Sequence, residues 1–119
     1  MARIDRVLLH LAEYRRVPID PADVYFLEAV GDETLVRTRR ARRLRDVRSL
    51  GEVFPFFAPH GFFRVHHNHA VNLGRIREIR RRRKGEDWEL KLEPPVNRVL
   101  PVSRTQIGRL LKAYGGKKS

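Results

Sequence analysis

The sequence predicts a mainly β domain, built from short antiparallel strands with two short helices. Its 119 residues suit a single domain, and Leu, Ile, Val and Phe account for 36 of them, which is enough to bury a core. Short runs of β-branched and aromatic residues recur between turn signals along most of the chain. Strong helix-start signals occur at only two places.

Residues 4–14 are the segment whose secondary structure the pattern leaves open. Their apolar side chains have the three- and four-residue spacing of a helix face, yet a strand is also compatible with them. The residues concerned are Ile4, Val7, Leu8 and Leu11. For the whole chain we expect a lead-in segment over 1–14, the domain over 15–114 and a flexible basic tail over 115–119.

A hairpin is predicted in the first third of the chain. Residues 24–27 and 34–38 are short β-prone runs, and the pair Gly31-Asp32 between them is typical of a turn. Further short strands are expected at 62–66 and 99–102.

A second hairpin is predicted to join residues 76–83 to 86–92 across a turn at Lys84-Gly85. A two-residue loop sets a register in which apolar faces apolar and acid faces base, at roughly 0.2–1 kcal/mol per pair. The predicted pairs are Ile79 with Leu90, Arg80 with Glu89, and Glu78 with Lys91. Part of this arginine-rich segment is therefore used for strand pairing rather than for ligand binding.

Two capping boxes, in which Ser is followed three residues later by Glu or Gln, predict the helices. The first helix begins at Ser49 and the second at Ser103, and we expect Pro55 and Gly115 to end them. Their apolar faces are expected to be Leu50, Val53 and Phe54 in the first, and Ile107, Leu110, Leu111 and Tyr114 in the second.

The net charge of +12 indicates a polyanionic partner. Arginine supplies 21 of the 26 basic residues, and its planar guanidinium suits bidentate contacts with phosphate and guanine. Two functions fit this charge: a DNA-binding regulator, and a non-specific RNA-binding or ribosome-associated protein. The second would need exposed stacking aromatics, whereas most Phe residues and the single Trp fall in strand or core patterns.

Several other classes of protein conflict with the composition. The chain has no cysteine, which excludes a disulfide scaffold, a thiolate zinc site and a thiol nucleophile. No apolar run approaches the roughly 18 residues of a membrane span, and the first residues do not resemble a signal peptide. We therefore expect a cytoplasmic protein with no membrane partner, no cofactor and no enzymatic activity.

The densest polar cluster of the sequence is His66-His67-Asn68-His69. A metal site would need three or four convergent ligands, and no acid lies near the cluster in the sequence. An HNH nuclease spreads its His, Asn and His over a strand, a loop and a helix rather than over four adjacent positions. Taken alone, the cluster fits a solvated turn after a strand.

Four segments, in order, resemble the LytTR family of bacterial DNA-binding domains, which occurs in LytR-, AlgR- and AgrA-type regulators. Residues 62–76 resemble its signature, Phe-x-Arg-x-His-Arg-Ser/Asn-aromatic-small/aliphatic-Val-Asn followed by Ile. Residues 23–32 resemble its early strand and Gly-Asn loop. Residues 47–50 resemble its Arg-x-Ser/Thr-Leu helix entry, and residues 100–104 its Ile-Pro-Val-Ser-Arg motif. The resemblance covers about residues 15–114.

The resemblance implies an elongated fold of three small antiparallel sheets that reads double-stranded DNA through loops in successive major grooves. Binding would usually occur at paired direct repeats, which implies a homodimer on DNA. Many members of the family are response regulators with a receiver domain ahead of this one, so an upstream receiver or sensor partner is expected. His67 replaces the more frequent Arg of the family, and His69 replaces an aromatic residue.

The candidate site residues fall into three groups. The resemblance implies base contacts from residues on three loops, namely His67, Asn68, Arg104, Glu33 and Thr34. The clustered positive charge indicates contacts with the DNA backbone, together with neighbouring polar residues, at Arg37, Arg39, Arg40, Arg42, Arg43, Arg64 and Thr105. The motif residues that would order the turns are His66, Asn72 and Ser103.

Overall fold

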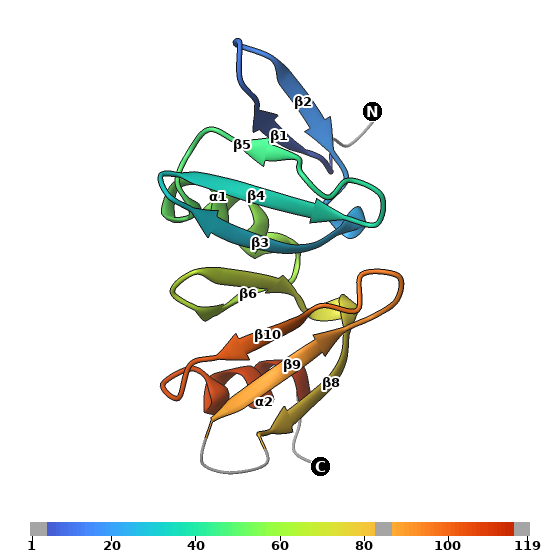
Figure 1. Cartoon of the computed structure of the whole chain (residues 1–119), viewed down its shortest axis with the longest axis vertical. Helices are drawn as coiled ribbons and strands as arrows, with labels where there is room; N and C mark the ends of the chain where they lie inside the picture. Colours follow the sequence, from blue (N-terminus) through green and yellow to red (C-terminus); the bar gives the residue numbers. More distant parts are fainter. Residues whose placement is uncertain (1–4, 83–86, 116–119) are drawn as a thin grey trace.

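The structure is a computed structural model that describes residues 5–82 and 87–115. Across these residues, antiparallel sheets of two, five and three strands follow one another along the longest axis of a molecule measuring 45 × 36 × 26 Å (Figure 1). Two short helices accompany the larger sheets, α1 (Leu50–Phe57) and α2 (Ile107–Gly115). The predicted fold class, mainly β with three small antiparallel sheets and two short helices, is confirmed.

The first sheet is a hairpin of β1 (Val7–His10) and β2 (Arg16–Ile19). It resolves the open N-terminal segment as a strand, because Val7 and Leu9 are buried while Leu8 between them is 48% exposed. This period of two is that of a half-buried strand. β2 was not predicted, because Pro18 interrupts its two β-branched residues, Val17 and Ile19.

The five-stranded sheet forms the middle of the molecule, with the strand order β5–β4–β3–β7–β6. Gly31 and Asp32 form the predicted turn between β3 and β4, and Gly31 adopts a φ of +61°, which glycine accepts without strain. The solvated turn suggested for the His66–His69 cluster is limited to His67 and Asn68, because His69 begins β7, whose four residues are all buried. The bounds are β3 (Val24–Val30), β4 (Glu33–Thr38), β5 (Arg45–Asp46), β6 (Phe62–His66) and β7 (His69–Asn72).

The predicted capping box begins α1. Ser49 Oγ accepts a hydrogen bond from Glu52 N at 3.3 Å, and Glu52 Oε1 accepts one from Ser49 N at 3.0 Å. The helix packs Leu50 and Val53 into a core that also contains the buried residues of β1. Capping at this point therefore fixes where the helix enters the core.

The prediction that Pro55 ends α1 is wrong, because the helix continues to Phe57. Proline removes the hydrogen bond to the carbonyl four residues earlier, which here belongs to the exposed Gly51 and can bind water instead. The additional turn of helix buries Phe57 completely, edge-on to Phe62 with ring centroids 4.9 Å apart. Phe57 thus occupies the central position expected for Phe54, which is only partly buried.

The three-stranded sheet has the order β10–β9–β8. Its predicted register is confirmed for the pairs Ile79 with Leu90, Arg80 with Glu89, and Glu78 with Lys91. The predicted turn at Lys84-Gly85 lies outside the described residues, as does the predicted tail beyond Gly115. The bounds are β8 (Ile76–Arg81), β9 (Trp88–Leu92) and β10 (Val99–Val102), and short 3-10 helices lie at Pro21–Asp23, Ala58–His60 and Leu73–Arg75.

The entry into α2 differs from the predicted capping box. The main-chain N–H of Ser103 donates to Val65 O at 2.8 Å, so it is not available to the Gln106 side chain. On the helix itself Leu110 is fully buried, whereas Leu111 is 44% exposed. The apolar face of α2 is therefore narrower than the sequence periodicity predicts.

Arg80→Ala is expected to lower the midpoint of urea denaturation slightly, because it removes a cross-strand ion pair. Arg80 Nε donates to Glu89 Oε2 at 2.6 Å, and the two side chains are 41% and 19% exposed, so solvent screens the pair only partly. Arg77→Ala, at an exposed position of the same strand, is the matched control and should leave stability unchanged. Equal losses for the two variants would contradict the assigned role of the pair.

Candidate nucleic-acid interface

Three turns from distant parts of the chain lie on one side of the molecule. We call this side the turn edge; it comprises the β3–β4 turn (31–32), the β6–β7 turn (67–68) and the turn into α2 (103–106), together with the side chains that flank and contact these turns. Ala29 N donates to Asn68 O at 2.8 Å, which joins the first turn to the second. Ser103 N donates to Val65 O at 2.8 Å, which joins the third turn to the second. All three turns lie on the left in Figure 1, one above another.

The central turn is held by its own hydrogen bonds. His66 Nδ1 accepts from Asn68 N at 3.2 Å, and Arg64 Nη2 donates to His67 O at 2.7 Å. Burial, followed by the nearby His67 and His69, lowers the pKa of His66 and so keeps its ring nitrogen able to accept. The exposed His67 ring stacks on His66 with centroids 4.4 Å apart. The exposed side chains of His67 and Asn68 thus stand on a turn of fixed shape.

Arg64, which was predicted to contact the DNA backbone, makes a hydrogen bond within the central turn. It is half-buried, and the hydrogen bond to His67 O directs its guanidinium back to the turn. A guanidinium held in this way braces the exposed residues of the turn, whatever other contacts its remaining N–H groups make.

Asn72 and His69 anchor the strand that follows the central turn. Asn72 is 8% exposed; its Oδ1 accepts from Gly74 N at 2.9 Å and its Nδ2 donates to Val24 O at 3.0 Å. His69 is 9% exposed, and its Nε2 lies 2.9 Å from Glu28 Oε2. Both side chains therefore connect β7 to its neighbours rather than facing solvent.

The third turn presents Arg104. Its Nε and Nη2 each lie 3.3 Å from Asp87 Oδ1, and the two side chains are 69% and 55% exposed. An ion pair this exposed is worth at most about 1 kcal/mol, so an incoming anion can replace Asp87 at small cost. Thr105 N donates to Ser103 Oγ at 3.2 Å, and the two hydroxyl groups lie 2.8 Å apart, which fixes the turn beneath Arg104.

The first turn presents Glu33 but not Thr34. Glu33 Oε1 accepts from Arg45 Nη1 at 3.2 Å. Thr34 is fully buried and its hydroxyl donates to Arg48 O at 2.9 Å. The prediction that Thr34 contacts a base is wrong, because side chains alternate along β4 and its even-numbered positions face inward.

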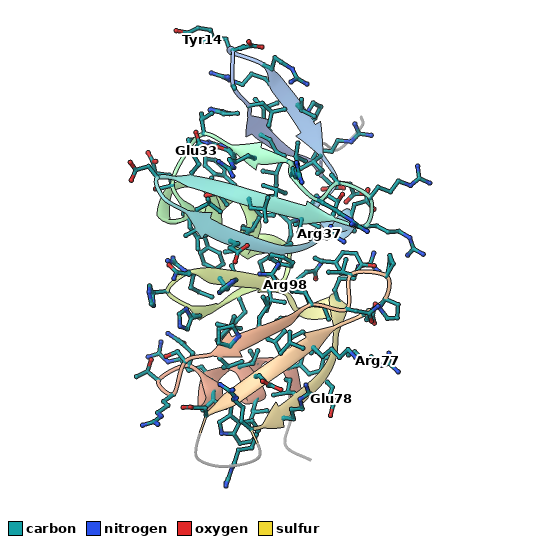
Figure 2. All side chains as sticks on the ribbon, viewed as in Figure 1. Tyr14, Glu33, Arg37, Arg77, Glu78 and Arg98 are labelled. Carbon is teal, nitrogen blue, oxygen red and sulfur yellow. The ribbon has the colours of Figure 1, made fainter. Side chains whose placement is uncertain are left out.

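The basic loop after β4 is far from the turn edge. β4 starts at the first turn with Glu33 and ends at Thr38. A strand of six residues is about 20 Å long, so the loop after Thr38 lies about that far from the first turn. Figure 2 shows Glu33 at one end of this strand and Arg37 near the other. Five of the arginines predicted to contact the DNA backbone therefore lie away from the three turns. They are Arg37, Arg39, Arg40, Arg42 and Arg43.

The profile of the LytTr DNA-binding domain matches residues 14–115 of the chain. The chain belongs to the LytTR family. This confirms the family that the four sequence motifs indicated, and with it a DNA-binding domain of transcription regulators.

A curated relative and a solved structure resemble this LytTR domain. The transcriptional regulatory protein YpdB of Escherichia coli O6:H1 is 33% identical over an alignment of 101 positions, which covers 76% of this chain and 38% of that protein. The chain thus spans well under half the length of this relative. A LytTr DNA-binding domain from Bacillus cereus has a TM-score of 0.71 at 23% identity, covering 93% of this chain and 97% of that one, and shares its fold.

Sequence reasoning missed two residues of the turn edge. Arg45 comes from β5, whose pairing with β4 brings it to Glu33, and Asp87 comes from the start of β9 to meet Arg104. Neither contact has a sequence signal, since each joins residues at least twelve positions apart.

In the described part of this LytTR domain, no helix is long and apolar enough to span a membrane, and no three His, Cys, Asp or Glu side chains converge as metal ligands.

The stability of the LytTR domain is expected to fall between pH 7 and pH 5. Burial lowers the pKa of His69 most, against the opposing effect of Glu28. Below about pH 6.5 the histidine of the unfolded chain binds a proton, whereas the buried histidine of the folded chain resists protonation. The contribution of His69 to the free energy of unfolding is therefore fully present above that pH and is lost as the pH falls below it. His69→Phe should make the urea-derived unfolding free energy vary less across this range. An unchanged pH profile in the variant would contradict this role.

Proposed function

We propose that this LytTR domain is a sequence-specific transcription regulator that reads the major groove through the three turns of the turn edge. The observation that carries the proposal is the alignment of these turns, from two sheets and a helix start, on one side of the molecule (Figure 1). The domain measures 45 Å along its longest axis, which exceeds one helical turn of B-DNA, about 34 Å. The domain is therefore long enough to extend along two successive major grooves, which we propose its turns enter.

The side chains proposed to contact base edges are His67, Asn68, Arg104 and Glu33. The first three are exposed. Arginine reads guanine in bidentate fashion, asparagine reads adenine, and a carboxylate such as that of Glu33 accepts from cytosine. Arg104 also stands beside the free N–H groups at the start of α2, which favour a neighbouring phosphate.

Contacts with the DNA backbone are proposed for Arg45 and Thr105, with Arg64 bracing the central turn. These residues lie on the turn edge, whereas the loop containing Arg39 and Arg43 does not. Phosphate contacts of this kind position the protein without reading sequence, and they make affinity depend on salt. Neutralising Arg45 should therefore lower specific and non-specific affinity by similar factors.

The regulator is proposed to act on paired direct repeats as a homodimer in the bacterial cytoplasm, without enzymatic activity of its own. The matched relative is about two and a half times the length of the aligned segment, so we propose that an upstream receiver or sensor partner delivers the signal. Direct repeats suit a protein whose copies bind in the same orientation, since a two-fold dimer would favour inverted half-sites.

Selection from a randomised duplex library at physiological salt tests the proposal. We expect one enriched motif, repeated in the same orientation, bound about 10³-fold or more tightly than bulk DNA. A chain that enriches no motif, or that binds a structured RNA as tightly as the best duplex, would contradict the proposal and favour a non-specific RNA-binding protein.

A further inference from the structure

A cavity of about 400 Å³ lies between the five-stranded sheet and the loop that joins β9 to β10. Three arginines line it: Arg37 from the end of β4, Arg42 from the following loop, and Arg98 from the β9–β10 loop. Figure 2 shows Arg37 near the end of β4 opposite to Glu33, with Arg98 below it. The cavity is therefore separate from the residues assigned to DNA reading.

The charge inside this cavity is unbalanced. No acidic residue is among its described lining residues, and neither Arg37 nor Arg42 has an acidic partner in the part of the chain that the structure describes. Burial, followed by repulsion from Arg42 and Arg98, lowers the pKa of Arg37. Arg37 Nε is also buried without a hydrogen-bond partner among the described residues. A buried donor of this kind is unfavourable until an acceptor reaches it.

The wall formed by the β9–β10 loop is fixed before any ligand arrives. Arg98 Nη2 donates to Glu28 Oε2 at 3.2 Å, and its guanidinium lies over the Phe26 ring at 5.2 Å. Tyr25 holds the same loop, because its hydroxyl donates to Pro94 O at 3.2 Å. This loop would therefore lose little conformational entropy when a ligand binds, which favours affinity.

The apolar lining of the cavity comprises the partly buried Leu35 and Val96, together with Phe26, which is fully buried. Its volume lies within the range of about 300–1,000 Å³ that is usual for small-molecule sites, and exceeds what one bare oxyanion would fill. An apolar surface beside converging guanidinium groups suits a ligand with two parts, an oxyanion and a flat apolar body.

We propose that this cavity binds a small organic oxyanion, a phosphate or carboxylate attached to a flat apolar group, through Arg37, Arg42 and Arg98. The oxyanion accepts hydrogen bonds from Arg37 Nε and from the Arg42 guanidinium, and the apolar group lies on Leu35 and Val96. The site does not depend on the DNA-reading function, since its ligand contacts no residue of the turn edge.

Titration of the ¹⁵N-labelled chain with phenyl phosphate tests the proposal, using the side-chain Nε–Hε signals of arginine as reporters. We expect saturable binding that shifts Arg37, with inorganic phosphate at least tenfold weaker and phenol inactive. Arg37→Gln and, separately, the exposed Arg42→Gln should each weaken phenyl phosphate binding at least tenfold. Arg39→Gln removes the same charge from the same loop outside the cavity, and should change affinity less than twofold.

Three results would overturn the proposal. One is the absence of saturable binding by the folded wild-type chain. Another is an equal loss of affinity in the Arg39→Gln and Arg42→Gln variants, which would mean attraction by net charge alone. The third is displacement of phenyl phosphate from Arg37 by a random-sequence duplex, which would assign the arginines to the DNA backbone. A failure of motif selection, by contrast, would leave the titration result intact and would bear only on the DNA-reading function.

Discussion

Asp46→Ala is expected to lower the free energy of unfolding by about 3–5 kcal/mol, the largest stability loss that we predict for a polar residue. Asp46 is fully buried, and its two oxygens accept from Arg48 Nη2 at 2.8 Å, Arg48 Nε at 3.0 Å and His10 N at 2.9 Å. Alanine would leave Arg48 without its charge partner and the His10 N–H without an acceptor. The first hairpin would also lose one of its links to the five-stranded sheet.

Urea denaturation followed by circular dichroism measures this loss. Asp32→Ala removes the same charge from an exposed turn and is the control, with an expected change within about 0.5 kcal/mol. Asp46→Asn keeps the size of the side chain but not its charge, so its loss should fall between the two. A loss below 1 kcal/mol for Asp46→Ala would contradict the structural role of the buried pair.

Asp46 also makes the stability of the domain depend on pH in the acid range. Burial acts to raise the pKa of Asp46, but the hydrogen bonds from Arg48 and from the main-chain N–H groups of His10 and Arg48 together outweigh it and lower the pKa. A lowered carboxyl pKa contributes stability above about pH 4, the ordinary value, and that stability is lost as pH falls through the folded-state pKa. Wild type should therefore lose stability below pH 4 more steeply than Asp46→Asn.

Arg104→Ala is expected to weaken binding to the selected DNA motif by about 5- to 150-fold, the equivalent of roughly 1–3 kcal/mol. Only a weak, exposed pair with Asp87 holds Arg104 in the free domain, so nearly all of the contact with guanine is gained on binding. Competition binding with duplexes substituted at each base should show relaxed preference at one position. Affinity for random DNA should fall much less.

Two controls separate base reading from simple loss of charge. Arg39→Ala removes one positive charge at the opposite end of β4 and should change motif affinity less than about threefold. Asp87→Asn frees Arg104 and should strengthen motif binding slightly. His67→Ala should relax a different base position, and its loss should add to that of Arg104→Ala because the two turns are separate. If Arg104→Ala and His67→Ala relaxed the preference at the same base position, the two turns would not read separate bases, and the assignment would be contradicted.

Local patterns in the sequence are sufficient to predict those elements whose geometry depends on residues close together in the chain. Ser49 and Glu52 cap α1 because a capping box involves residues three positions apart. The register of β8 and β9 follows from charge and hydrophobic matching across a short connection. The LytTR motifs indicated the family on the same basis, since each motif is a contiguous stretch of residues.

Tertiary packing decided the features that depend on distant residues. Burial of Phe57 carries α1 past Pro55, and the inward face of β4 buries Thr34, although neither outcome is visible in the neighbouring sequence. The arginines of residues 37–48 form one block in the sequence, but the direction of β4 and the pairing of β5 place Arg45 on the turn edge and Arg37 at the cavity. Charge content is a property of composition, whereas the surface on which a charge acts depends on how the strands pair.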